Sequence, residues 1–157
     1  MFFYKNYDKI YIEKKKEVII IRLWHQKLIP HLPRQQLLGQ HRELCALRGK
    51  GWGRKHSVVN YVFTHTPAWL VAYHWLVMDE MKRRGYRPDP QWECVNWRGN
   101  ILGLDTSFVA DPDTVEEYYY YASEKGEIIY PEHNDEYLQE CLENLKGKGI
   151  DLYETLE

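Results

Sequence analysis

"LPRQQLLGQHRELCALRGKGWGRKH", residues 32–56, is the stretch that decides the fold. After Pro33, four residues lie at the spacing of one helical face, namely Leu37, His41, Leu44 and Arg48. This spacing predicts a helix over residues 33–48. Proline is well tolerated in the first turn, where its N–H would have no partner. Gln36, Gln40 and Glu43 fall on the opposite, polar face. Three glycines among several cations then predict a basic loop over residues 48–56.

Two more long helices are predicted further along the chain. Thr66-Pro67 is a cap and first-turn pair for a helix over about 67–84, which Gly85 ends. Asn134 or Asp135 caps a last helix over about 135–146. A shorter helix is expected between a capping box at Asp113 and Glu116 and a stop at Gly126. Residues 57–63 allow either a strand or buried coil, and residues 86–103 are expected to be loop.

The predicted fold class is all-α (mainly α): a compact single domain of three principal helices with long loops. The length of 157 residues and an apolar content of 44% fit one folded domain. Its three cysteines are widely spaced and form no ligand motif with histidine, so we expect reduced thiols in a cytoplasmic protein, without metal or cofactor. No apolar run is long enough for a membrane span, and no signal peptide is evident.

Charge is distributed unevenly along the chain. The net charge is +2 over residues 1–21, +8 over residues 22–104 and −12 over residues 105–157. A basic central part favours a polyanion such as nucleic acid, and the acidic end would oppose non-specific binding. Two oppositely charged surfaces that only keep the protein soluble are the alternative.

Two motifs carry a resemblance to a known family. "RLWHQKLIP" with "LPRQQLLGQHRE", residues 22–30 and 32–43, resembles short prokaryotic members of the pyrimidine dimer DNA glycosylase family, typified by phage endonuclease V. "YPEHNDEYLQECLENLKGKG", residues 130–149, is more weakly similar to the last helix of that family. The resemblance implies an endonuclease V-like fold and a bifunctional enzyme. Such an enzyme cuts the N-glycosidic bond at a UV-induced dimer and then nicks the abasic site by β-elimination.

The resemblance also implies the site residues. The nucleophile is the α-amine of the first residue, which corresponds to Ile21, and the arginine beside it is Arg22. The glutamate that assists catalysis corresponds to Glu43, and Arg42 is its neighbour. A further family arginine falls near Ala46, and Arg48 is a candidate substitute. From sequence alone, a glutamate on a polar helix face such as Glu43 is more often a solvated carboxylate.

The expected DNA-binding residues come from two sources. The resemblance implies that the arginines near the glutamate and the terminus hold the DNA backbone, and charge and aromatic character add the loop residues. Cations next to glycines can approach phosphates, and tryptophan can stack on bases. The candidates are Arg22, Arg42, Arg48, Lys50, Trp52, Arg54 and Lys55. The expected partner is double-stranded DNA with UV photoproducts or abasic sites, and the protein is expected to be a monomer that contacts no membrane.

A leader, residues 1–21, precedes the family-like part. It makes the nitrogen of Ile21 a peptide amide, which is not a nucleophile. Three explanations are open. The first is a misassigned start, since codons for Lys16, Glu17 and Val18 can encode a ribosome-binding sequence. The second is removal of the leader by a protease, and the third is that the leader is real. The last case leaves a lyase that uses a lysine such as Lys27, or a non-catalytic nucleic-acid-binding module. A protein-interaction domain is the third class considered.

Overall fold

The computed structural model describes residues 21–55 and 58–156. Within these ranges the chain is helical and forms no strand beyond one isolated bridge between Trp97 and Leu104, which confirms the all-α prediction. With η for 3-10 helices, the elements are η1 (Gln26–His31), α2 (Arg34–Arg48), η2 (Asn60–Thr64), α3 (Pro67–Arg83), η3 (Pro90–Glu93), α4 (Gly99–Leu102), α5 (Pro112–Lys125), α6 (Asp135–Lys146) and η4 (Glu154–Leu156). None of the described helices is long and apolar enough to cross a membrane.

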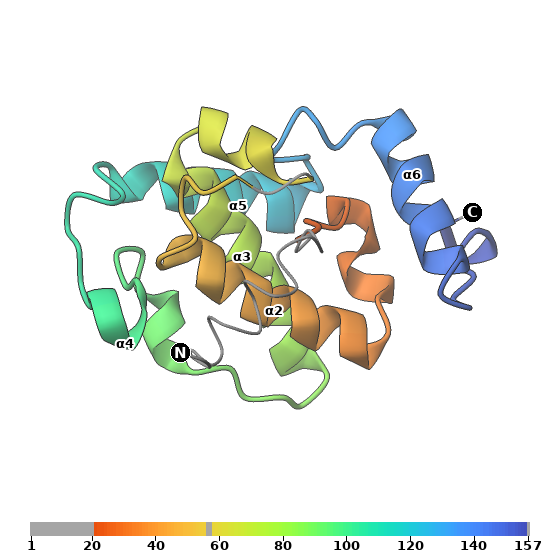
Figure 1. Cartoon of the computed structure of the whole chain (residues 1–157), viewed down its shortest axis with the longest axis horizontal. Coiled ribbons are helices and arrows are strands. Elements are labelled where there is room, and N and C mark those ends of the chain that lie inside the picture. The colour runs from red at the N-terminus through yellow and green to blue at the C-terminus, as the bar shows by residue number, and fades with distance from the viewer. Residues whose placement is uncertain (1–20, 56–57, 157) are drawn as a thin grey trace, which may run out of the picture.

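Helix α3 is the centre of the molecule. It packs against α2 on one side and α5 on another, with η1 and η2 also in contact (Figure 1). Its buried residues lie all around the helix, as expected of a helix enclosed by others. The Thr66 side chain accepts a hydrogen bond from the Ala68 amide, and Gly85 adopts a φ of +89° after the last turn. Both predicted ends of this helix are confirmed.

Helix α2 carries the stretch that decides the fold. It begins after Pro33 and ends at Gly49, whose amide bonds to the carbonyls of Ala46 and Cys45. Its C-terminus is also capped by a distant side chain: Arg98 Nε donates to the Arg48 carbonyl at 2.8 Å, and Arg98 Nη2 donates to the Gly49 carbonyl at 2.9 Å. The residue that precedes α4 is thereby attached to the end of α2.

One residue of α2 contradicts the sequence-based pattern. Gln40 was assigned to the polar face, yet its exposed fraction is 0%, like that of Leu37 and Leu44. The N-terminal segment, residues 21–25, packs over this face of the helix, and Gln40 bonds to its backbone. The sequence pattern of one helix could not reveal that covering segment.

The N-cap of helix α5 lies two residues before the predicted cap. Asp111 is the N-cap and accepts a hydrogen bond from the Asp113 amide, with Pro112 in the first turn. The prediction of a capping box at Asp113 and Glu116 was therefore wrong, while the stop at Gly126, with φ of +72°, is confirmed. Since α5 has 14 residues and packs along α3, the described fold has a fourth long helix beside the three expected.

Helix α6 lies at one side of the molecule, next to the N-terminal segment (Figure 1). Asn134 caps it through its side chain, which accepts from the Tyr137 amide, so Asn134 and not Asp135 is the N-cap. The Tyr137 hydroxyl donates to the Leu23 carbonyl at 2.7 Å. Residues 60–64 form the 3-10 helix η2. Of the two alternatives left open for residues 57–63, strand and buried coil, the strand is therefore excluded for the described residues.

Candidate active site

A pocket of about 390 Å³ opens where the N-terminal segment, α2 and the end of α6 meet. It unites two residues predicted from the sequence, Arg22 and Glu43. The described residues that line it are Arg22, Trp24, Gln35, Gln36, Gly39, Gln40, Glu43, Val58, Asn144 and Lys148. The pocket therefore combines an arginine, a carboxylate and an amine among amide side chains, a set suited to proton transfer and anion binding.

Among the described residues of this lining, Glu43 is the only carboxylate. It is half-buried on α2, and its Oε1 accepts a hydrogen bond from Gln40 Nε2 at 3.1 Å. Burial raises the pKa of Glu43 to about 7, and the Gln40 hydrogen bond and the charge of Arg42 act in the opposite direction. A carboxyl group that is half ionised near neutral pH can both accept and donate a proton during a reaction.

The N-terminal segment is held close to Glu43 by Gln40. Gln40 Nε2 donates to the Arg22 carbonyl at 2.7 Å as well as to Glu43, and Gln40 Oε1 accepts from the Trp24 amide at 2.7 Å. Ile21 directly precedes Arg22 and is 8% exposed, so it belongs to the core although we expected it to end the leader. The rest of the predicted leader, residues 1–20, lies outside the described residues.

Arg22 lines the pocket from the N-terminal segment and also contacts α6. Its Nη1 lies 3.9 Å from the Cys141 sulfur and 3.8 Å from a Glu140 carboxylate oxygen. Its guanidinium also lies over the Trp24 ring, 5.6 Å from the centroid. Arg42 is exposed on α2, one residue before Glu43. Both predicted arginines therefore lie near the carboxylate.

Arg48 does not lie at this surface, and its predicted phosphate contact is wrong. Its exposed fraction is 0%, and it donates to the carbonyls of Trp92 and Cys94, each at 2.7 Å. Burial lowers the pKa of Arg48 to about 10, which leaves it protonated at neutral pH. The sequence showed its charge and its place on the buried stripe, but not the carbonyl groups of residues 92–97 that solvate it.

The basic loop after α2 is only partly what the sequence predicted. Lys50, Arg54 and Lys55 are exposed, and the loop begins roughly 9 Å along the helix axis from Glu43. Trp52 is instead a packing residue, since its ring makes edge contacts with Phe63 at 5.0 Å and Phe108 at 5.4 Å. His56 lies outside the described residues.

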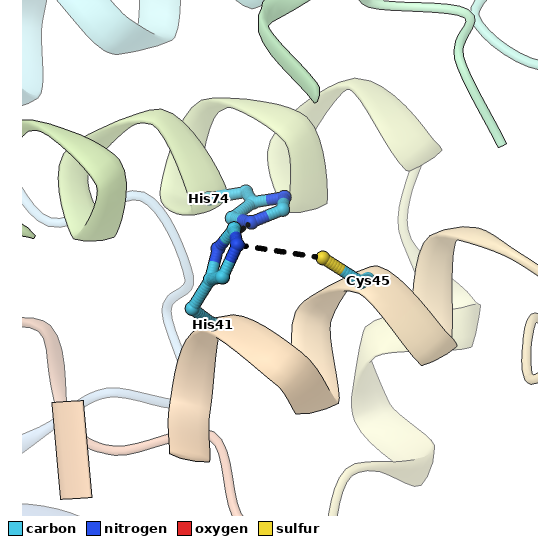
Figure 2. A group of neighbouring side chains, drawn as sticks. All are labelled: His41, Cys45 and His74. Carbon is cyan, nitrogen blue, oxygen red and sulfur yellow. Dashed lines mark hydrogen bonds between the residues drawn. The ribbon is translucent and has the colours of Figure 1, made fainter. Parts of the chain in front are cut away.

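A histidine and cysteine cluster lies between α2 and α3 (Figure 2). His41 and Cys45 on α2 and His74 on α3 each offer a ligand atom, all within 4.8 Å of one another. His41 Nδ1 lies 2.9 Å from His74 Nε2, whereas its other nitrogen, Nε2, faces the Cys45 sulfur at 3.8 Å. The two nitrogens of His41 thus point to different partners and not to one common centre.

Arg48 determines what this cluster can hold. Its Nη1 lies 3.0 Å from His74 Nδ1, and a guanidinium can only donate, so that nitrogen must carry the lone pair. The His74 proton then sits on Nε2, where a metal would need an electron pair. Burial lowers the pKa of His41 and His74, and burial raises the pKa of Cys45 to about 12. The cluster is a neutral hydrogen-bonded chain that fits poorly as a metal site.

Comparison with known proteins gives one family match. Residues 21–94 match the family described as pyrimidine dimer DNA glycosylase, which supports the assignment of this segment to that family. No curated protein and no solved structure matches the chain.

The matched segment contains most, but not all, of the pocket. It begins at Ile21 and includes Arg22, Gln40 and Glu43, whereas Asn144 and Lys148 come from beyond it. Sequence reasoning missed those last two because a lysine in an acidic region gives no local signal. Gln40 was missed because helical periodicity alone placed it on the solvent side.

Proposed function

We propose that this chain is a DNA repair N-glycosylase with AP-lyase activity, acting on UV-induced pyrimidine dimers in double-stranded DNA. The observation that carries the proposal is the single side chain of Gln40, which bonds to both the Arg22 backbone and the Glu43 carboxylate. Position 21, where the family's amine is expected, is thus next to a residue anchored beside a carboxyl group with a raised pKa. The match of residues 21–94 to the pyrimidine dimer DNA glycosylase family supports the substrate class.

The chemistry needs an unprotonated amine near a proton-transferring group. An α-amine with a pKa of about 7.7–8 is roughly one quarter neutral near pH 7.4, whereas a lysine near 10.4 is about one thousandth neutral. The amine nitrogen of residue 21 would bond to C1′ as the glycosidic bond breaks. The electron pair of the glycosidic bond leaves with the pyrimidine. Glu43 would give a proton to the sugar ring oxygen as the ring opens to an imine.

The second step would cut the backbone. Removal of a proton from C2′ of the imine moves an electron pair into a new C2′–C3′ double bond and expels the 3′-phosphate. Glu43, once ionised, is the group in the pocket that can accept such a proton. Arg22, Arg42, Lys50, Arg54 and Lys55 would hold the neighbouring phosphates, together with Lys148.

An amine at position 21 exists only if residue 21 is the first residue of the active protein. A corrected start or proteolytic removal of residues 1–20 would provide it. Two lysines are candidates to replace this α-amine. Lys27 lines a different pocket, with Ile29 and Leu76, whereas Lys148 lines the pocket of Glu43. Lys148 is therefore the better alternative amine in a chain with its leader.

Borohydride trapping tests the proposal. The full chain and a form that begins at residue 21 are incubated with UV-irradiated duplex DNA and, separately, with abasic duplex DNA. A covalent adduct with the shorter form alone is the expected result. Adducts with both forms that vanish in Lys148→Arg would move the nucleophile to that lysine. No adduct from either form on either DNA would overturn the lyase assignment.

Glu43→Gln is the matched control. It should keep DNA binding and lose strand cleavage, because the amide fills the same space but cannot take up a proton. Retained cleavage would remove Glu43 from the mechanism, and loss of both binding and cleavage would point to a structural role.

A further inference from the structure

Gln40 makes three hydrogen bonds inside the candidate site and has a fourth polar neighbour there. Its side-chain oxygen accepts from the Trp24 amide at 2.7 Å and lies 3.0 Å from the Tyr73 hydroxyl. Its side-chain nitrogen donates to the Arg22 carbonyl at 2.7 Å and to Glu43 Oε1 at 3.1 Å. A glutamine amide has two donor N–H groups, so both of its donors are in use.

The orientation of this amide is fixed by backbone groups. The Trp24 N–H can only donate and the Arg22 carbonyl can only accept, so the oxygen must face Trp24 and the nitrogen must face Arg22. The nitrogen therefore also faces Glu43. Rotating the amide by half a turn would place its NH₂ group against the Trp24 N–H and its oxygen against the Arg22 carbonyl. Both backbone groups would then be buried without a hydrogen-bond partner, which costs stability.

We propose that Gln40 is the positioning residue of the reaction, holding the N-terminal segment and the Glu43 carboxylate in one fixed arrangement. This inference rests on the proposed function. One nitrogen atom bonds to both the residue that follows the attacking amine and the carboxyl group that assists it. A shift of the segment along α2 would break the bonds to Arg22 and Trp24 together, so the amine cannot drift from Glu43 without losing both.

Tyr73 on α3 secures this arrangement from behind. It is fully buried, and its hydroxyl donates to the Trp24 carbonyl as well as approaching Gln40 Oε1. Tyr73 does not bond to Glu43 or to Arg22. It therefore provides a matched control: a buried polar contact to the same glutamine that should affect stability and not the carboxylate.

A purely structural glutamine and a positioning glutamine predict different results. A structural one would alter only the free energy of unfolding. A positioning one also sets the ionisation of Glu43, because a donated N–H stabilises the carboxylate form. The pKa of Glu43, followed by carbon-13 NMR of labelled glutamate and assigned with Glu43→Gln, is thus a direct readout.

The experiment uses the form that begins at residue 21. Gln40→Met keeps the length of the side chain and removes the hydrogen bonds to Arg22, Trp24 and Glu43. Gln40→Glu keeps the acceptor oxygen that faces Trp24 and loses the donors. We expect both variants to lower the single-turnover cleavage rate by about 100-fold, with a small change in DNA affinity. Gln40→Met should also raise the pKa of Glu43. Tyr73→Phe should lower the melting temperature and leave that pKa unchanged.

The outcomes separate this inference from the function itself. If the unsubstituted form neither cleaves nor traps DNA, the proposed function fails and Gln40 is not at issue. If that form is active and a folded Gln40→Met keeps its rate and the pKa of Glu43, Gln40 is only structural and the inference is overturned. If Gln40→Met does not fold, as judged by near-ultraviolet circular dichroism, Gln40→Glu decides by its rate.

Discussion

Glu43 illustrates how burial adapts an ordinary residue to chemistry. On an exposed helix face its pKa would be near 4.5, and it would be fully ionised at neutral pH. The N-terminal segment covers that face, and the resulting loss of water brings the pKa to about 7. The same burial raises the free energy of the folded protein when Glu43 is ionised. The raised pKa that suits Glu43 to proton transfer therefore lowers the stability of the fold.

The pH dependence of stability should reveal this effect. Because the pKa of Glu43 is raised in the folded state, its contribution to stability is complete below pH 4.5 and is lost as the pH rises through about 7. Glu43→Gln cannot titrate. We expect its melting temperature to equal that of the unsubstituted protein at pH 4.5 and to exceed it by about 2–4 °C at pH 8. Equal melting temperatures at both values would contradict the raised pKa.

Arg48 makes the opposite contribution, since it is a charge that the fold needs. Its guanidinium is solvated by backbone carbonyls of residues 92–97 in place of water. Arg48→Met keeps the length of the side chain and strands those carbonyls, so we expect a loss of about 3–5 kcal/mol in urea denaturation. Arg42→Met, on the exposed side of the same helix, should change stability by less than about 0.5 kcal/mol. A similar small loss for both would show that Arg48 is dispensable.

At the scale of helices, capping residues in the sequence predicted where helices begin and end. Which residues of a helix are buried depends on tertiary packing. Thr66, Gly85 and Gly126 act where they stand in the sequence, so the limits of α3 and the end of α5 were predictable. Gln40 and Arg48 depend on segments far along the chain. A polar residue on a helix can be buried only when another segment brings hydrogen-bond partners to it. The sequence of one helix does not show which segment does so.

The cap of α6 gives a test at this scale. Asn134 accepts from the Tyr137 amide, and α6 ends close to the pocket residues Asn144 and Lys148. Asn134→Ala should cost about 1 kcal/mol of stability and speed hydrogen exchange in the first turn of α6. Asp135→Ala, which removes only a charge near the helix dipole, should cost about a third of that. Equal losses would indicate that charge and not capping stabilises this end.

For the molecule as a whole, the separation of charge is less complete than the sequence indicated. The acidic region, residues 105–157, supplies a lysine to the pocket whose other charged residues, Arg22 and Glu43, come from the basic region. The site is therefore assembled from both regions. The sequence predicted the basic half of the site through motif and charge, and the other half required the packing of α6 beside the N-terminal segment.

Salt dependence of DNA binding tests that assembly. If Lys148 contacts a phosphate, Lys148→Ala should reduce the slope of log affinity against log salt concentration by about one. Lys125→Ala, an exposed lysine in the same acidic region at the end of α5, should leave the slope unchanged. Fluorescence anisotropy with an abasic duplex measures both. Identical slopes for the two variants would exclude a phosphate contact at Lys148.

The link between Arg98 and the end of α2 has a consequence for anyone who trims this protein. The recognisable family segment stops at residue 94, an inviting place to cut. Such a fragment would lack the Trp97 carbonyl that faces Arg48 and the Arg98 guanidinium that bonds to the Arg48 and Gly49 carbonyls. It would also lose α5, the partner of α3. The smallest autonomous piece is thus longer than the piece that sequence similarity outlines, and a gene fragment ending at residue 94 should yield insoluble or unfolded product.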